Sequence, residues 1–138
     1  MKRNTQIRTV RPESSRKGVQ GLPCFVGISA QTAGSEGISL SLVEIPPGAV
    51  SEPHVHDGYE TAIYLLEGEV ETRYGEYLEQ VVVNRAGDFV YVPPGLPHQA
   101  RNLSETRPAR ALVARNDARE MEKVLPYGAP GEDSAEKA

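Results

Sequence analysis

The chain is short of several residue types, and each shortage excludes a class of structure. Its 138 residues include one cysteine and no tryptophan. A single cysteine, Cys24, cannot close an intrachain disulfide, and its apolar surroundings at residues 22–28 are typical of a buried thiol. No apolar run reaches the length of a signal peptide or a transmembrane helix. We therefore expect a reducing, cytoplasmic location and a fold that is held together by its core.

Positive charge is also in short supply. The chain has 15 Lys and Arg residues against 19 Asp and Glu residues, a formal net charge of −4. This balance gives no electrostatic reason to expect nucleic acid or an anionic membrane as a partner. Basic residues do gather before residue 18, where we expect a solvated arm. The alternative is that one of these arginines binds a phosphate or a carboxylate.

What the sequence has in quantity is short apolar or alternating segments separated by glycine and proline. They predict strands at residues 24–31, 39–45, 61–67, 69–75, 77–83, 88–92, 98–102 and 110–115. Segments of this length and spacing are typical of an all-β sandwich or barrel. A closed or two-sheet arrangement is favoured over an open sheet, because short strands need many cross-strand partners.

One helix is predicted near the end of the chain, at residues 118–124, with Asp117 as its cap. We expect a single domain over residues 1–127, which includes the N-terminal arm. The small, charged, Gly- and Pro-containing stretch at residues 128–138 is predicted to be a disordered tail.

Histidine is scarce too, and two of the three histidines lie in the stretch PHVHDGYE at residues 53–60. On an extended segment His54 and His56 share a face, with Cα atoms about 6.5–7 Å apart, so both imidazoles can reach one metal ion. Glu60 would lie about 13 Å beyond His56 on a straight strand. Because Asp57-Gly58 is a strong turn dipeptide, we predict a hairpin there that returns Glu60 to the histidine pair.

The third histidine, His98, follows a rigid, proline-rich turn at residues 93–97. Three imidazoles and one carboxylate suit one divalent transition metal: manganese, iron, nickel, copper or zinc. In an octahedral shell this set leaves two positions open, as catalysis or ligand binding requires. The alternative is that these are ordinary surface or core histidines, which fits their spacing less well.

These residues resemble the two sequence motifs of the cupin superfamily, and those of small single-domain bacterial cupins in particular. The first motif is matched by Gly48, His54, His56, Glu60 and, one position late, Gly68. The second motif is matched at every spacing by Gly87, Pro93, Gly95, His98 and Asn102. The resemblance implies a double-stranded β-helix, or jelly-roll barrel, with one metal ion inside it.

The same resemblance implies the ligands of that metal, which are His54, His56, Glu60 and His98. It also implies a homodimer, of a kind that frequently exchanges an N-terminal strand. Asn102, which closes the second motif, is expected to be a turn or hydrogen-bonding residue and not a ligand.

Strand alternation predicts which residues surround the ligands. Alternation that starts from Glu60 puts Ala62, Tyr64 and Leu66 on the same face of the strand as Glu60. Counting from His98 places Ala100 inward. Over residues 88–92 two sets of inward-facing residues are possible: Phe89 with Tyr91, or Asp88, Val90 and Val92. Tyr64 is the candidate catalytic residue, with a hydroxyl near the metal; the alternative is a core tyrosine.

No nucleophile or acid–base dyad stands out, so any reaction is predicted to be centred on the metal. A redox metal would suit a dioxygenase, and a non-redox metal would suit an isomerase or decarboxylase acting on a small organic molecule. The alternatives are a non-catalytic small-molecule binding or sensing protein and, less consistent with a complete ligand set, a structural or storage barrel. A small-molecule partner is expected, without nucleic acid or membrane.

Overall fold

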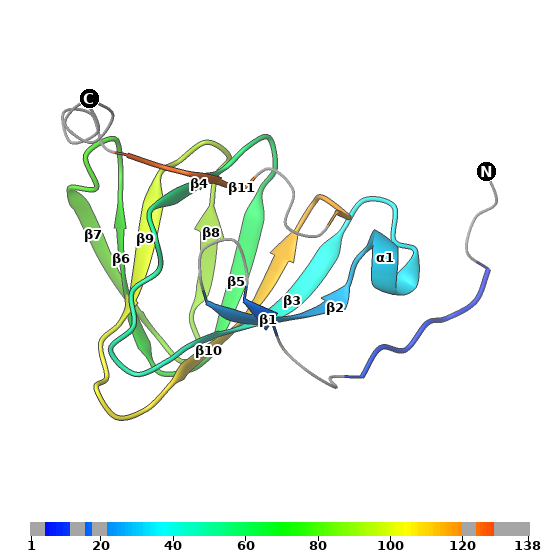
Figure 1. Cartoon of the computed structure of the whole chain (residues 1–138), viewed down its shortest axis with the longest axis horizontal. Helices are drawn as coiled ribbons and strands as arrows, with labels where there is room; N and C mark the ends of the chain where they lie inside the picture. Colours follow the sequence, from blue (N-terminus) through cyan, green and yellow to red (C-terminus); the bar gives the residue numbers. More distant parts are fainter. Residues whose placement is uncertain (1–4, 12–15, 18–21, 120–123, 129–138) are drawn as a thin grey trace.

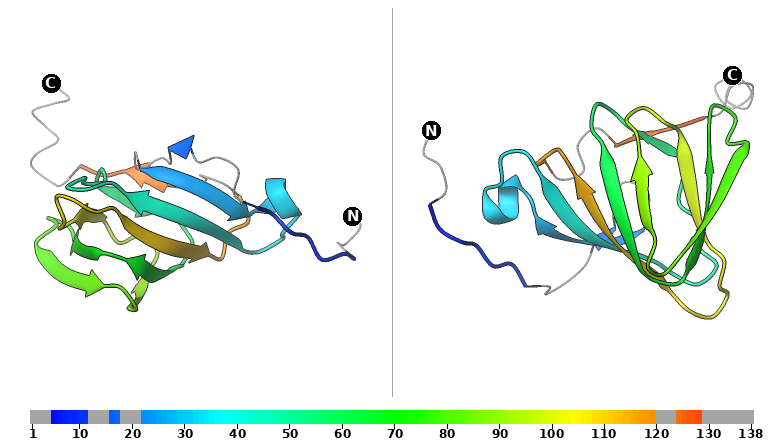
Figure 2. Two further views of the ribbon diagram at one scale, coloured as in Figure 1. Left: turned by 90° about the horizontal axis from the view of Figure 1, so that it is seen from below. Right: turned by 180° about the vertical axis from the view of Figure 1, so that it is seen from behind.

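The strands pair into two antiparallel sheets that lie face to face (Figures 1 and 2). The computed structural model describes residues 5–11, 16–17, 22–119 and 124–128. The six-stranded sheet has the order β1 (Arg16–Lys17), β2 (Pro23–Ile28), β3 (Ser39–Ile45), β10 (Ala109–Arg115), β5 (Thr61–Glu67), β8 (Phe89–Val92). The five-stranded sheet has the order β11 (Val124–Pro126), β4 (His54–His56), β9 (His98–Asn102), β6 (Glu69–Tyr74), β7 (Gln80–Arg85). The predicted all-β, two-sheet jelly roll is confirmed.

Most of the strands predicted from the sequence are present, with small changes at their ends. Strands β3, β5 and β9 have the predicted bounds, β6, β8 and β10 differ by one residue at one end, and β7 is shifted by two to three residues. The strand predicted at 24–31 ends earlier, because Ser29 caps the short helix α1 (Ala30–Ala33). The Ser29 hydroxyl accepts a hydrogen bond from the Thr32 amide at 3.2 Å, and the Thr32 hydroxyl accepts one from the Ser29 amide at 2.8 Å. This reciprocal capping box competes with continuation of the strand.

The helix predicted at residues 118–124 is wrong. Ala118 and Arg119 are not helical, and Val124–Pro126 form β11, which pairs with β4. Residues 120–123 lie outside the described residues, as do residues 129–138 of the predicted tail. Helix propensity is a weak preference, and here the open edge of β4 offers the backbone ladder hydrogen bonds instead. Across the described part of the chain α1, with four residues, is the single helix, and no helix has the length to cross a membrane.

Inward-facing residues of the two sheets make the core. On β3 and β10 the buried positions alternate with less buried ones, which is the period of a strand with one face inward. The buried apolar side chains of this core are Leu22, Cys24, Val43, Ile45, Leu65, Val70, Ala109, Ala111 and Val113. Cys24 is buried, as its surroundings predict.

Asn102 ties the end of β9 to neighbouring loops. Its side chain is fully buried. Its Nδ2 donates to the carbonyls of Ile45 at 3.0 Å and Arg107 at 2.8 Å, and its Oδ1 accepts from the Ser104 amide at 2.9 Å. The asparagine of the second motif is therefore a hydrogen-bonding residue, as predicted.

Candidate metal centre

The fold brings the three histidines together on the inner face of the five-stranded sheet. His54 on β4 and His98 on β9 are direct cross-strand partners, and His56 lies two residues along β4 on the same face. The ring centroids are 4.3 Å apart for His54 and His98, 4.7 Å for His56 and His98, and 5.1 Å for His54 and His56. One nitrogen of each ring lies within 4.8 Å of the others, and all three side chains are buried. The predicted histidine cluster is present.

Each ring is held by its Nδ1 atom. The Nδ1 of His54 is 2.8 Å from the Glu52 carbonyl oxygen, and the Nδ1 of His98 is 2.9 Å from the Leu96 carbonyl oxygen. A carbonyl only accepts, so these two Nδ1 atoms donate and carry the hydrogen. In a neutral ring the Nε2 atom then keeps its lone pair for a metal ion.

These two contacts share a local sequence. In each, the accepting carbonyl lies two residues before the histidine, with Pro53 or Pro97 between them. Proline restricts its own φ and the conformation of the residue before it, so both carbonyls are presented in the same way. This repeated X-Pro-His pattern is a sequence signal for the Nδ1 partners that the motif spacing alone does not reveal.

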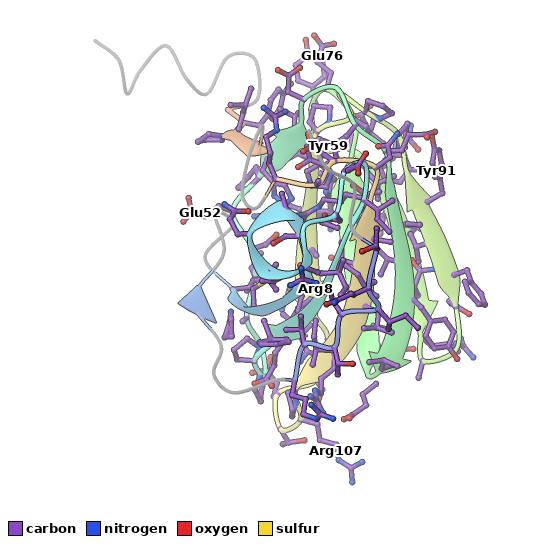
Figure 3. All side chains as sticks on the ribbon, turned by 90° about the vertical axis from the view of Figure 1, so that its right-hand side faces the viewer. Arg8, Glu52, Tyr59, Glu76, Tyr91 and Arg107 are labelled. Atoms are coloured by element: carbon purple, nitrogen blue, oxygen red, sulfur yellow. The ribbon has the colours of Figure 1, made fainter. Side chains whose placement is uncertain are left out.

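The opposite sheet holds the third ring. The hydroxyl of Thr61, the first residue of β5, lies 2.9 Å from Nδ1 of His56, and Thr61 is almost completely buried. The His56 ring also stacks on Tyr59 at 5.2 Å between centroids, with an interplanar angle of 14°. Figure 3 shows Tyr59 among the strands and the Glu52 side chain on the outside. Neither Thr61 nor Tyr59 is singled out by the sequence, because both contacts depend on how the two sheets meet.

The protonation state of the cluster suits a metal ion. Burial, followed by the charges of His98, Arg115 and His54, lowers the pKa of His56 to about 2. Burial and the charge of His54 lower the pKa of His98 to about 4. Burial also lowers the pKa of His54. At neutral pH all three rings are uncharged, which is the form that binds metal.

The structure does not place Glu60 in this cluster. Its side chain is exposed, and its carboxylate accepts a hydrogen bond from the Tyr91 hydroxyl at 2.6 Å. The predicted hairpin is wrong, because β4 and β5 belong to different sheets. The chain does turn, with Gly58 at a φ of 83°, but it crosses from one sheet to the other. The role of Glu60 as a fourth ligand stays a prediction.

A cavity of about 550 Å³ opens between the sheets beside the histidines. The residues of β5 that line it are Thr61, Ile63 and Leu65, so the face counted from Glu60 is the wrong one. Tyr64 does not line the cavity and its ring packs against Phe89, with 4.8 Å between centroids. A single-residue offset reverses every side chain of a strand, which explains this error. The placement of Tyr64 offers no contact with the cluster.

Two further predictions concern the residues that line the cavity. Ala100 lines the cavity, as alternation from His98 predicts. On β8 all four residues line it, but Val92 is buried whereas Phe89 is 83% and Tyr91 59% exposed. Val90 and Val92 of the second set therefore face inward, whereas Asp88 is not among the lining residues. The two aromatic residues form the rim, where Figure 3 shows Tyr91 at the edge of the sheet.

One cavity residue was not anticipated. Arg115, at the end of β10, lines the same cavity as the histidines, and its guanidinium carbon lies 5.7 Å from the centre of the Tyr59 ring. No Asp or Glu is among the described residues that line the cavity.

Comparison with known proteins identifies the family and the fold. The Cupin domain model matches residues 41–115, more than half of the chain. Germin-like protein subfamily T member 3 of Arabidopsis thaliana is 30% identical over 119 residues, which cover 83% of this chain and 49% of that protein. Germin-like protein subfamily T member 2 of the same plant is 33% identical over 93 residues, covering 65% of this chain and 41% of that protein. The chain thus spans about half or less of the length of these relatives.

Solved structures share the architecture. A recombinant oxalate oxidase in complex with glycolate superposes with a TM-score of 0.70 and 19% identity, over 96% of this chain and 74% of its own. A Cupin 2 conserved barrel domain protein from Salinispora arenicola superposes with a TM-score of 0.64 and 24% identity, over 84% of this chain and 92% of its own. Identities this low show the fold alone.

Proposed function

This chain belongs to the cupin family, and we propose that it binds one divalent transition-metal ion through His54, His56 and His98 to act on a small organic molecule. The observation that carries the proposal is the histidine cluster itself. Its rings are buried and uncharged at neutral pH, and their Nδ1 atoms are engaged by Glu52, Thr61 and Leu96. In protein metal sites, one ring nitrogen of a histidine binds the ion and the other is held by a hydrogen bond to the protein.

The residues present fit a first-row metal. Imidazole suits iron, nickel, copper and zinc, and manganese would favour an added carboxylate, the role predicted for Glu60; geometry and availability select among these metals. A bound ion would supply Lewis acidity toward an oxygen of the organic molecule, or electron transfer if the ion is redox-active. The protein itself positions the rings through β4, β9 and Thr61, and its cavity offers the bound molecule mainly apolar walls.

The composition of the cavity favours chemistry at the ion. No carboxylate of the described residues lines the cavity, so a general base of that type is missing from its walls. We therefore favour oxygenase-type or isomerase-type chemistry.

Oxygen uptake or product formation by metal-loaded protein with a panel of small organic acids would support catalysis. Retention of an unchanged ligand without turnover would support a binding or sensing protein instead. The homodimer and the cytoplasmic location stay predictions.

Metal titration tests the site directly. Protein stripped with a chelator should bind manganese, iron, nickel or zinc at one ion per chain in isothermal titration calorimetry. His98→Asn keeps a donor for the Leu96 carbonyl but loses the ring nitrogen, and should weaken binding about 100-fold or more. Arg101→Ala, an exposed residue of the same strand, is the matched control and should bind as wild type does. Undiminished binding by His98→Asn would contradict the proposed site.

The same titration decides the role of Glu60. If its carboxylate joins the ion, it must first leave the Tyr91 hydroxyl. Glu60→Gln should then weaken metal binding, and Tyr91→Phe should strengthen it by about tenfold or less, the value of one exposed charge-assisted hydrogen bond. If neither substitution changes the affinity, the three histidines alone form the protein's share of the site.

A further inference from the structure

Arg115 is an inward-facing cation that forms no ion pair with an acidic residue in the described part of the chain. It follows Ala111 and Val113 on the inner face of β10, and like them it lines the cavity. Its Nε is buried and makes no hydrogen bond to any residue that the structure describes, which is also true of the Nε of Arg110. Arg110, on the other face of the same strand, instead lies 3.5 Å from the Glu67 carboxylate. Of these two arginines, only Arg110 has a counter-ion among the described residues.

The position of the Arg115 guanidinium is defined by its neighbours. Its carbon lies 5.7 Å from the centre of the Tyr59 ring, within the range of a cation–π interaction. Tyr59 is only 3% exposed and stacks on His56, and the cross-strand partner of Arg115 is Thr61, whose hydroxyl contacts the same histidine. Arg115 is thus held close to the histidine cluster by the residues that hold His56.

A partly buried cation without a counter-ion is costly for the fold, and it is stabilised when an anion reaches it. No Asp or Glu of the described residues lines the cavity, so these walls do not supply the anion, and a ligand can. The planar guanidinium forms paired hydrogen bonds with carboxylates. In the metal-free protein one unpaired cation matches one negative charge, which favours a carboxylate over a doubly charged phosphate.

The walls of the cavity add a second requirement. They are mainly apolar, with Val43, Leu65, Val70, Val82, Val90 and Val113 among the lining residues. A volume of about 550 Å³ is ample for a small ring or a branched chain. A ligand with an apolar body covers these side chains and gains the free energy of burying apolar surface.

We propose that Arg115 binds the carboxylate of a small monocarboxylic acid whose apolar body lies between the two valine-rich sheet faces. Arg115 is then a residue that determines substrate specificity. The inference rests on the proposed function only where it places this acid beside the metal ion. The contact between Arg115 and the carboxylate requires no metal.

Binding of four probes to metal-free protein tests the proposal by calorimetry. Benzoate should bind about 10- to 100-fold more tightly than neutral benzamide, which has the same shape, because the carboxylate gains charge-assisted hydrogen bonds. Benzoate should also bind at least about tenfold more tightly than acetate or oxalate, which lack the apolar body. Tighter binding of oxalate or acetate than of benzoate would overturn the apolar part of the proposal.

Two variants of β10 isolate the cation. Arg115→Gln should lose the preference for benzoate over benzamide, and Arg110→Gln should keep it. Equal discrimination by Arg115→Gln and wild type would overturn the role of Arg115. If Arg115→Gln does not fold, NMR of wild-type protein labelled with ¹⁵N-arginine tests the same contact between Arg115 and the carboxylate. Benzoate, and not benzamide, should shift one arginine Nε–Hε resonance, and the absence of any such shift would refute the contact.

Failure of this inference is distinguishable from failure of the proposed function. Arg115→Gln should bind metal with the stoichiometry of wild type, because Arg115 is not among the three histidine ligands. Wild-type protein that binds no metal would refute the proposed function, and the probe titrations, made on metal-free protein, would still decide the role of Arg115.

Discussion

Acidification should destabilise the metal-free protein through its buried histidines, at pH values where most carboxylates are still ionised. Burial, together with neighbouring charges, lowers the pKa of His56 to about 2 and that of His98 to about 4, and burial lowers the pKa of His54 as well. In an unfolded chain an imidazole titrates near pH 6.5. Because the folded pKa values lie below the unfolded one, the unfolded state takes up protons first as the pH falls. The stabilisation is complete above about pH 6.5 and is lost toward the folded values.

The size of the effect follows from the linkage between protonation and folding. Between about pH 6.5 and pH 5, a histidine that titrates only in the unfolded state removes about 1.6 kcal/mol from the free energy of unfolding. His56 and His98 together therefore remove about 3 kcal/mol, and His54 acts in the same direction. A domain of this size has a total stability of about 5–15 kcal/mol, so the loss is a large fraction of it.

Urea unfolding followed by far-UV circular dichroism, with a chelator present throughout, measures this slope. His98→Asn is the matched variant, because its amide can still donate to the Leu96 carbonyl but does not titrate. Over the same pH range its stability should fall by about 1.6 kcal/mol less than that of wild type. A wild-type loss below about 1 kcal/mol, or equal slopes in the two proteins, would refute the reasoning.

Two further predictions concern the scaffold. Gly68→Ala should destabilise the protein by about 2–4 kcal/mol, because φ is +95° and the new Cβ would lie 2.9 Å from a backbone atom of Ala109. Gly37→Ala, with no atom within 4 Å of the new Cβ, should be neutral in the same thermal melts, and equal effects of the two would contradict the steric argument. Asn102→Ala should cost about 2–4 kcal/mol in urea unfolding, because it leaves buried groups without hydrogen bonds. Asn84→Ala, which loses one 3.3 Å contact to a carboxylate, should cost less than about 1 kcal/mol, and a larger cost there would count against this account.

Local patterns predicted the strands well and the path between them poorly. Strands β3, β5 and β9 were predicted with their observed bounds, because alternation and turn residues are properties of adjacent residues. The segment at 57–60 was predicted as a hairpin, since a turn dipeptide does not say whether the chain returns to the same sheet. The face of β5 was predicted one residue out of phase, because Glu60 was assumed to lie beside the histidines.

The sequence by itself determined the all-β class and the convergence of its three histidines. The spacing within HVH puts His54 and His56 on one face of a strand, and the second motif supplies His98, the cross-strand partner of His54. Only the tertiary structure decided what surrounds them. Thr61 and Arg115 come from the opposite sheet, and the distance between two sheets is set by packing of the whole core, not by residues near each other in sequence. The position of Glu60, bonded to Tyr91 from another strand, depends on the same packing.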